Sequence, residues 1–127
     1  MATLGIEMVG LKAGEVELRM PYAAAYARQH GFIHAGIITT ALDSACGYAA
    51  FLLMPDDAAV LTVEFKTNLI APARGDCFLF RASVLKPGRT ITVCDAQAFA
   101  AEQGKEKLIA TMTGTMMALF GREGIAH

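Results

Sequence analysis

Hydrophobic and polar positions divide the chain into a helical segment and a series of strands. Residues 34–54 read HAGIITTALDSACGYAAFLLM, which is rich in Ala, Leu and Met, contains no Pro and stops before Pro55. Such a run is typical of a helix. Its apolar residues lie almost all the way round, which predicts a helix enclosed on most sides by the rest of the protein.

After this helix the hydrophobic period changes to two. Leu61, Val63, Phe65, Thr67 and Leu69 alternate with polar residues, which predicts a half-buried strand with these five on one face and Thr62 on the other. Three further strands are predicted at 76–86, 89–101 and 107–120, and two short ones at 6–11 and 15–20.

Glycine-containing turns join the later strands. Pro87 and Gly88 predict a type II turn, because Pro supplies φ near −65° and Gly supplies a positive φ. Residues 102–105 contain Gly104 and predict a second hairpin. The elements together predict an α+β fold in which an antiparallel sheet wraps one long central helix. A length of 127 residues fits a single domain, 1–127.

Composition and charge narrow the classes of partner. Hydrophobic residues make up 54% of the chain and charged residues 18%. A domain of this size cannot bury so much apolar surface in its own interior, so the remainder is expected to lie in contacts between identical subunits. A formal net charge of −1 argues against nucleic acid or an anionic membrane as partners. The N-terminal sequence does not resemble a signal peptide, because no basic residues precede a long apolar run. The longest apolar segment is too short to span a membrane, so the expected location is the cytoplasm.

Cysteine chemistry is disfavoured. Cys46, Cys77 and Cys94 are odd in number and form no CxxC pair, so reduced buried thiols are expected rather than a disulfide framework or a zinc site. A Cys46 nucleophile is disfavoured because the nearby Asp43 opposes thiolate formation and no His follows until His127. Motifs of serine hydrolases, zinc proteases and nucleotide-binding loops are absent from the sequence.

Asp43 is the candidate for acid–base chemistry. It is the only carboxylate between Glu17 and Asp56 and lies within the apolar helix. An unpaired buried carboxylate is costly, so Asp43 needs either a partner or a use. Thr39 and Thr40, at i−4 and i−3, provide possible hydrogen bonds. A structural, hydrogen-bonded Asp and a catalytic base or nucleophile are both open at this point.

The start of the helix is a second candidate. Residues 31–36 read GFIHAG, and small residues let a ligand approach free backbone N–H groups, whose partial positive charge suits a developing oxyanion. Glycine near a helix start is also common for steric reasons alone. His34 is either a packing or capping residue or a base. Gln29 and His30 either hold a water or are solvated, and Arg89 is either solvated or meets a phosphate.

Three segments taken in order resemble the hotdog-fold acyl-CoA thioesterases of the PaaI-like (phenylacetate-degradation) family. They are GFIHAGIITTALDSACGYA, TVEFKTNLIAPARGD and LKPGRTITVCDAQ, and the likeness runs from about residue 29 to about residue 119. In that family a His-Gly-Gly turn opens the central helix and an acidic residue follows nine positions after the His. The matching residues here are His34, Ala35, Gly36 and Asp43, with Ala35 in place of the first Gly.

The resemblance implies a role for each matched residue. The N–H of Ala35, with Gly36 beside it, polarises the thioester carbonyl, while Asp43 directs water or attacks the carbon. Thr62 stands where family members carry a Ser or Thr that contributes to the site. Gly88 and Arg89 match a turn near the CoA nucleotide. His34 and His30 are expected to contact substrate, and Gln29 or His30 replaces a loop Asn whose place Arg28 takes.

The expected activity is hydrolysis of a small or aromatic acyl-CoA to free acid and CoA, without a metal or other cofactor. Ala35 and Asp43 are eight residues apart, about 12 Å along a helix, too far to meet one carbonyl. The sequence therefore predicts a homodimer or homotetramer with active sites shared between subunits. The alternative is a non-catalytic hotdog that binds or senses acyl-CoA. A dehydratase on this fold is disfavoured because it needs a His near the acidic residue, and His34 lies too near the helix start.

Overall fold

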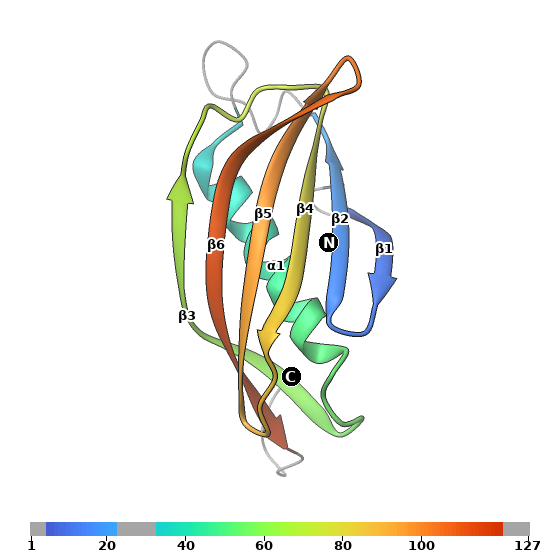
Figure 1. Cartoon of the computed structure of the whole chain (residues 1–127), viewed down its shortest axis with the longest axis vertical. Coiled ribbons are helices and arrows are strands. Elements are labelled where there is room, and N and C mark those ends of the chain that lie inside the picture. Colours follow the sequence, from blue (N-terminus) through green and yellow to red (C-terminus); the bar gives the residue numbers. More distant parts are fainter. Residues whose placement is uncertain (1–4, 23–32, 121–127) are drawn as a thin grey trace.

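Six antiparallel strands form one sheet, and a single helix lies diagonally against one of its faces (Figure 1). The computed structural model describes residues 5–22 and 33–120. The strand order is β1-β2-β4-β5-β6-β3, so β1 and β3 form the two edges. The elements, in chain order, are β1 (Glu7–Lys12), β2 (Glu15–Pro21), α1 (Ala35–Phe51), β3 (Ala58–Leu69), β4 (Cys77–Lys86), β5 (Ile91–Glu102) and β6 (Lys105–Phe120). This arrangement is the hotdog fold and confirms the predicted α+β architecture.

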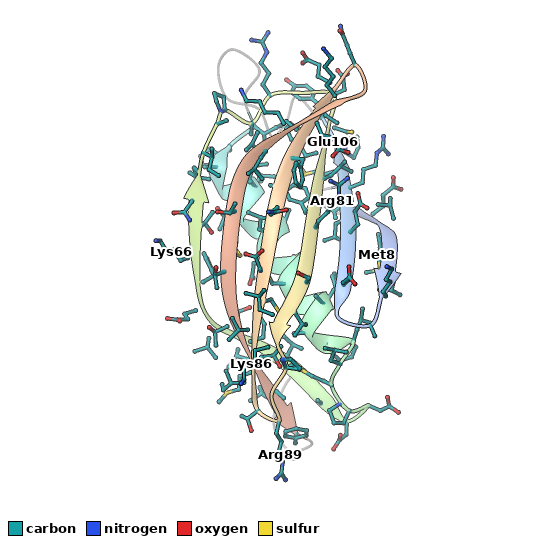
Figure 2. The ribbon with its side chains drawn as sticks, in the orientation of Figure 1. Met8, Lys66, Arg81, Lys86, Arg89 and Glu106 are labelled. Atoms are coloured by element: carbon teal, nitrogen blue, oxygen red, sulfur yellow. The ribbon has the colours of Figure 1, made fainter. Side chains whose placement is uncertain are left out.

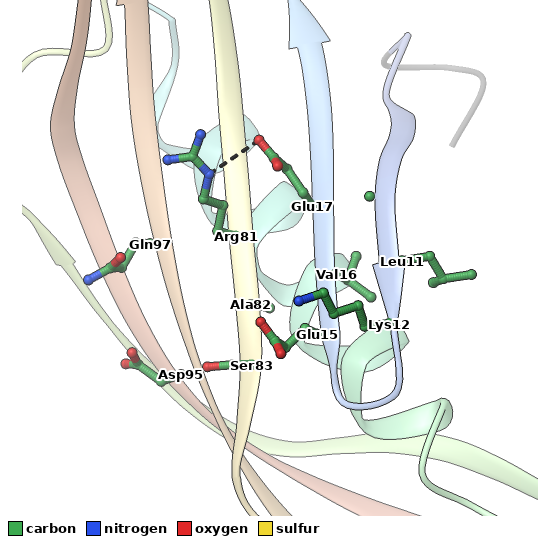
Figure 3. A pocket seen from close by; sticks show the side chains of 11 residues that line it. Leu11, Lys12, Glu15, Val16, Glu17, Arg81, Ala82, Ser83, Asp95 and Gln97 are labelled. Carbon is green, nitrogen blue, oxygen red and sulfur yellow. Dashed lines mark hydrogen bonds and ion pairs between the residues drawn. The ribbon is translucent and has the colours of Figure 1, made fainter.

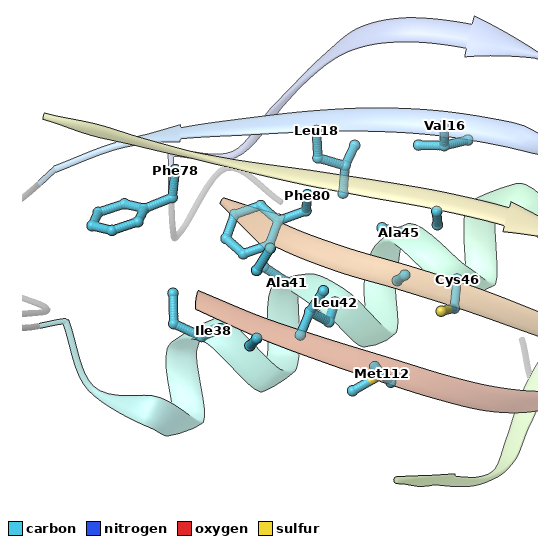
Figure 4. Packing of buried hydrophobic residues seen from close by; sticks show 14 of the residues in the cluster. Val16, Leu18, Ile38, Ala41, Leu42, Ala45, Cys46, Phe78, Phe80 and Met112 are labelled. Carbon is cyan, nitrogen blue, oxygen red and sulfur yellow. The ribbon is translucent and has the colours of Figure 1, made fainter. Parts of the chain in front are cut away.

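The core lies between α1 and the sheet. One face of the helix is fully buried at three- and four-residue spacing, as an amphipathic helix requires. These residues are Ile38, Ala41, Leu42, Ala45, Cys46, Ala49 and Ala50. Four of the seven are alanines, so the helix axis lies close to the strands. Phe78, Phe80, Leu18 and Met112 fill the remaining space from the sheet side (Figure 4).

The described chain by itself encloses less of α1 than the sequence predicted. The sheet covers only one face of α1, and on the opposite face Tyr48 and Phe51 are 41% and 45% exposed. The Ala-rich sequence raises hydrophobicity around the whole circumference, but a single sheet provides only one layer of packing.

No helix in the described residues, 5–22 and 33–120, is long and apolar enough to cross a membrane.

Strand β3 exists as predicted, but its half-buried character is wrong. As an edge strand it pairs only with β6, and its other edge faces no strand in the described residues. Its apolar side chains stay open to solvent: Leu61 is 48% exposed, Val63 52%, Phe65 47% and Leu69 59%. We refer to these four residues as the β3 apolar strip.

A β-bulge at Val63 also changes which residues share a face. Thr62 pairs with Met116 and Glu64 with Thr115, so Val63 has no partner in the register. Cross-strand partners point to the same side of a sheet, and Met116 is fully buried on the helix side. Thr62 therefore points toward α1 instead of away from it. Uninterrupted alternation, as the sequence predicted, would have placed Thr62 on the outer face.

The two later turns differ in their use of glycine. Gln103 and Gly104 both have positive φ, 52° and 79°, which forms the predicted tight hairpin between β5 and β6. Gly88 is not among the positive-φ residues, so the predicted type II turn is wrong. Instead, a Cβ atom at Gly88 would overlap the carbonyl oxygen of Ile91. Glycine is needed there because the backbone passes so closely.

Gly88→Ala is expected to lower the free energy of unfolding by about 1–3 kcal/mol, because the turn must move to admit the methyl group. Gly47→Ala is the matched control, since an added Cβ in that helical position meets only Val60 Cγ1, at 4.0 Å. That variant is expected to be as stable as the wild type or up to about 1 kcal/mol more stable. Urea denaturation at one protein concentration measures both. A Gly88→Ala protein as stable as the wild type contradicts the steric explanation.

Candidate active site

Asp43 and Thr62 meet at the middle of the helix. The hydroxyl Oγ1 of Thr62 donates a hydrogen bond of 2.8 Å to Asp43 Oδ1 and lies 3.4 Å from Met116 Sδ. Asp43 is half-buried, and the described residues provide no hydrogen bond to its Oδ2. The bulge at Val63 turns Thr62 toward the helix, so two residues nineteen positions apart form one polar pair.

The partners predicted for Asp43 within the helix are wrong. Thr40 Oγ1 donates to the carbonyl of Gly36, at 2.8 Å, as Thr often does to the residue four positions earlier in a helix. The hydrogen bond that Asp43 accepts in the described chain comes from Thr62 rather than from Thr39 or Thr40. Asp43 is thus oriented by the sheet.

A pocket of about 390 Å³ opens beside this pair. Its lining, as far as the structure describes it, consists of Asp43, Ser44, Gly47, Tyr48 and Phe51 from α1 and Val60 and Thr62 from β3. Asp43 and Thr62 supply the polar end, and Tyr48, Phe51 and Val60 continue the pocket as an apolar arm. A carboxylate at the wall of an apolar pocket is suited to act as a base or nucleophile on a bound reactant.

At the start of α1, the N–H groups differ in whether they already have a hydrogen-bond partner in the described chain. His34 is the N-cap, with φ −61° and ψ 135°, and its Nδ1 accepts a 3.0 Å hydrogen bond from the N–H of Gly36. In this structure the cap therefore occupies the N–H of Gly36, which was predicted to lie beside the Ala35 donor. The N–H of Ala35 has no hydrogen bond within the described residues and lies at the positive end of the helix. The capping role considered for His34 is confirmed.

The other predicted site residues do not lie beside Asp43 and Thr62 in the described part of the chain. Gly88 and Arg89 occupy the turn between β4 and β5, at the opposite end of the sheet from the start of α1 (Figures 1 and 2). Arg89 is exposed at this turn, at the end of the sheet away from the start of α1. Gln29 and His30 lie outside the described residues. The structure thus brings Asp43 and Thr62 together and leaves Ala35 and Arg89 separate from them.

Burial disfavours the reactive thiolate form of Cys46 and Cys94. Burial raises the pKa of the Cys46 thiol far above its usual value, and Cys94, Asp43 and Asp95 raise it further. Burial also raises the pKa of Cys94 to about 11, and its Sγ contacts the carbonyl of Cys46 at 3.5 Å. The raised pKa disfavours the thiolate of Cys46, in line with the expectation that it is not a nucleophile. All three cysteines are free, but Cys77 is only half-buried, since it stands at the first position of β4.

The outer face of the sheet carries a second hollow, of about 280 Å³, that sequence reasoning missed (Figure 3). The sequence signal for this hollow was the set of polar residues that alternate with buried apolar residues in β2, β4 and β5. Arg81 dominates this face: its Nε lies 3.2 Å from Glu17, and its two terminal nitrogens bind Glu106 at 2.9 and 3.0 Å. The bonds to Glu106 raise the pKa of Arg81 and lower that of Glu106. Arg81 also lies 4.8 Å from the Phe99 ring centre. None of the predicted site residues lines this hollow.

The fold and site define a hotdog-fold protein with a carboxylate on its central helix. A family model described as the thioesterase superfamily matches residues 30–107, more than half of the chain. The chain therefore belongs to the thioesterase superfamily.

Individual relatives agree with this assignment. A solved thioesterase family protein from Silicibacter pomeroyi is 62% identical, covers 95% of this chain and 89% of its own, and superposes with a TM-score of 0.94. A curated protein of Saccharolobus solfataricus, whose name assigns it only provisionally to the esterases, is 31% identical over 74% of this chain; the match spans 66% of its length. The E. coli PaaI protein from the phenylacetic acid degradation operon shares the fold, with a TM-score of 0.83 at 22% identity, covering 94% of this chain and 83% of its own.

Proposed function

We propose that this protein is an acyl-CoA thioesterase of the PaaI-like branch, acting in the cytoplasm on small or aromatic acyl groups. The observation that carries the proposal is the Asp43 carboxylate, held by Thr62 at 2.8 Å and facing an apolar pocket in a thioesterase-superfamily fold. Asp43 removes a proton from water or attacks the carbonyl carbon itself. In the first case the C–O bond to water forms as Asp43 takes the proton, the C–S bond breaks, and the leaving CoA thiolate takes up that proton. In the second case the C–O bond to Asp43 forms and the C–S bond breaks with loss of the CoA thiolate, and water then hydrolyses the mixed anhydride to free acid and restores Asp43.

A helix N-terminus supplies the electrophilic part of the site. The N–H of Ala35 stabilises negative charge on the carbonyl oxygen without a metal or redox cofactor. Asp43 and Ala35 are eight residues apart on α1, about 12 Å along its axis, whereas base and donor must each lie about 3 Å from the reacting group. The two groups at one thioester therefore come from different subunits.

The edge strand β3 is the surface through which a second copy would supply that N-terminus. It combines a free backbone edge with the β3 apolar strip, beside exposed Tyr48 and Phe51 of α1. A two-fold axis at this edge makes the two helices antiparallel, so that the start of one helix points toward the middle of the other. Each dimer then holds two shared sites, whether or not two dimers form a tetramer.

The deciding experiment is a thiol-release screen of the purified protein across acyl-CoA chain lengths and aryl groups. Turnover of at least one acyl-CoA supports the proposal. Binding of CoA esters without release of thiol instead identifies a non-catalytic acyl-CoA sensor, an alternative raised by Arg28 in place of the loop Asn.

Thr62→Ala is expected to lower kcat about 10-fold, because one hydrogen bond that aligns Asp43 is lost and tenfold corresponds to about 1.4 kcal/mol. Thr62→Ser retains the hydroxyl and is expected to be close to wild type. Thr62→Val keeps the shape of Thr without the hydroxyl and should match Ala. Steady-state kinetics at saturating substrate measure all three. Equal damage by Ser and Ala would show that the hydroxyl is not what matters.

A further inference from the structure

The apolar arm of the active-site pocket runs from Asp43 toward the C-terminal half of α1. Tyr48 and Phe51 border it from the helix and Val60 borders it from β3. Between them stands Gly47, one helical turn beyond Asp43, which contributes no side chain. A Cβ at Gly47 would find its closest neighbour, Val60 Cγ1, only at 4.0 Å. The space between helix and strand is therefore open at this position.

The chemistry of the arm fits only one part of a CoA thioester. Its described lining contains no Lys, Arg or His, so it offers no charge for the phosphates of the nucleotide. Beyond Asp43 and Thr62, the arm presents mainly carbon atoms of aromatic and aliphatic side chains, which suit neither the phosphates nor the amide groups of the pantetheine chain. An acyl group has the matching apolar surface, and it is attached directly to the carbonyl that reacts at Asp43.

We propose that Gly47 determines the size of the acyl group that the site accepts, an inference that rests on the proposed thioesterase function. A glycine in the middle of a helix costs about 1 kcal/mol relative to alanine, and an ordinary side chain here would project into the arm. With Gly47, an acyl chain or ring passes Asp43 and lies between Tyr48, Phe51 and Val60. Acetyl groups are too short to reach this space and do not depend on it.

The test compares acyl groups that do and do not reach the arm. Gly47→Leu is expected to raise KM for benzoyl-CoA and hexanoyl-CoA at least about 10-fold more than it raises KM for acetyl-CoA. Gly47→Ala adds only a Cβ and is expected to raise KM for benzoyl-CoA and hexanoyl-CoA less than Gly47→Leu does, so that the effect follows the size of the side chain. If Gly47→Leu raises KM equally for acetyl-CoA and hexanoyl-CoA, the proposal is overturned, and this holds also when the cause is dissociation of subunits. An unchanged KM for the larger groups overturns it as well.

A second variant removes a wall of the arm. Phe51→Ala lengthens the arm instead of filling it, so the ratio of kcat/KM for decanoyl-CoA to that for hexanoyl-CoA is expected to rise about 5-fold or more. An unchanged ratio contradicts a role for this pocket in acyl selection. This variant tests the arm independently of whether Leu is tolerated at position 47.

Binding of non-hydrolysable thioethers separates this proposal from the proposed function. S-hexyl-CoA is expected to bind the wild type at least about 10-fold more tightly than S-methyl-CoA, and Gly47→Leu is expected to remove this preference. Calorimetry gives both dissociation constants even if the protein releases no thiol from any ester. In that case the thioesterase proposal fails while the acyl-binding role of the arm stands. Equal affinity of the wild type for both thioethers overturns the role of the arm.

Discussion

Asp43→Asn is expected to lose turnover by about 100-fold or more while it still binds CoA esters. The side-chain amide has nearly the same size, and its oxygen still accepts the 2.8 Å hydrogen bond from Thr62, so the pocket keeps its shape. A neutral amide neither takes a proton from water nor attacks a carbonyl carbon. The loss should therefore appear in kcat, measured by thiol release at saturating substrate, and leave the dissociation constant of a CoA thioether unchanged.

The matched control is Asp95→Asn. Asp95 is a half-buried carboxylate on the outer face of the sheet, beside Ser83 in the register with β4, and it does not line the pocket of Asp43. This variant should keep wild-type kcat. Full activity of a folded Asp43→Asn protein would assign Asp43 a purely structural role as the hydrogen-bond partner of Thr62.

Ala35→Pro and Asp43→Asn subunits, each inactive alone, are expected to recover about half of wild-type activity when combined in one dimer. Ala35→Pro removes the N–H that stabilises the oxyanion, and Pro is well tolerated at the first position of a helix. The preceding residue, His34, already has the extended conformation that Pro requires of its neighbour, with ψ 135°. The helix should therefore form normally in this variant.

The recovery follows from how the defects are distributed. If donor and base at one site come from different subunits, a mixed dimer contains one site with both defects and one site with neither. If both groups came from the same subunit, every site of the mixed dimer would carry one defect. The two variants are refolded together, and the mixed dimer is isolated through a tag on one subunit and assayed for thiol release. No recovery in a verified mixed dimer rules out the shared site.

Local patterns in the sequence were sufficient to predict the helix and the strands and to single out Asp43 as the candidate acid–base residue. The long Ala-rich run without Pro predicted α1, and alternation predicted β3 to β6, because these signals depend on neighbours along the chain. Asp43 was conspicuous because an isolated carboxylate in an apolar helix is costly.

Features that depend on other strands were not predicted. The bulge at Val63 leaves no mark in the alternation of β3, yet it turns Thr62 toward Asp43. The exposure of Phe65 depends on β3 being an edge strand, which is a property of the strand order. Gly88 was assigned a positive φ from its place after Pro, whereas its actual constraint is the carbonyl of Ile91 three residues later.

The open edge of β3 has a consequence for how the protein is made in a cell. In the described residues, β3 presents unpaired backbone donors and acceptors next to four exposed apolar side chains, and in the proposed dimer they stay uncovered until a second chain binds. Association of two chains is a second-order process, so its rate is proportional to the square of the concentration of free chains. Capture of a free chain by chaperones or proteases is instead proportional to the first power of that concentration. For such a dimer, slow expression would lengthen the life of the uncovered chain, and the steady-state amount of protein would rise more steeply than its rate of synthesis.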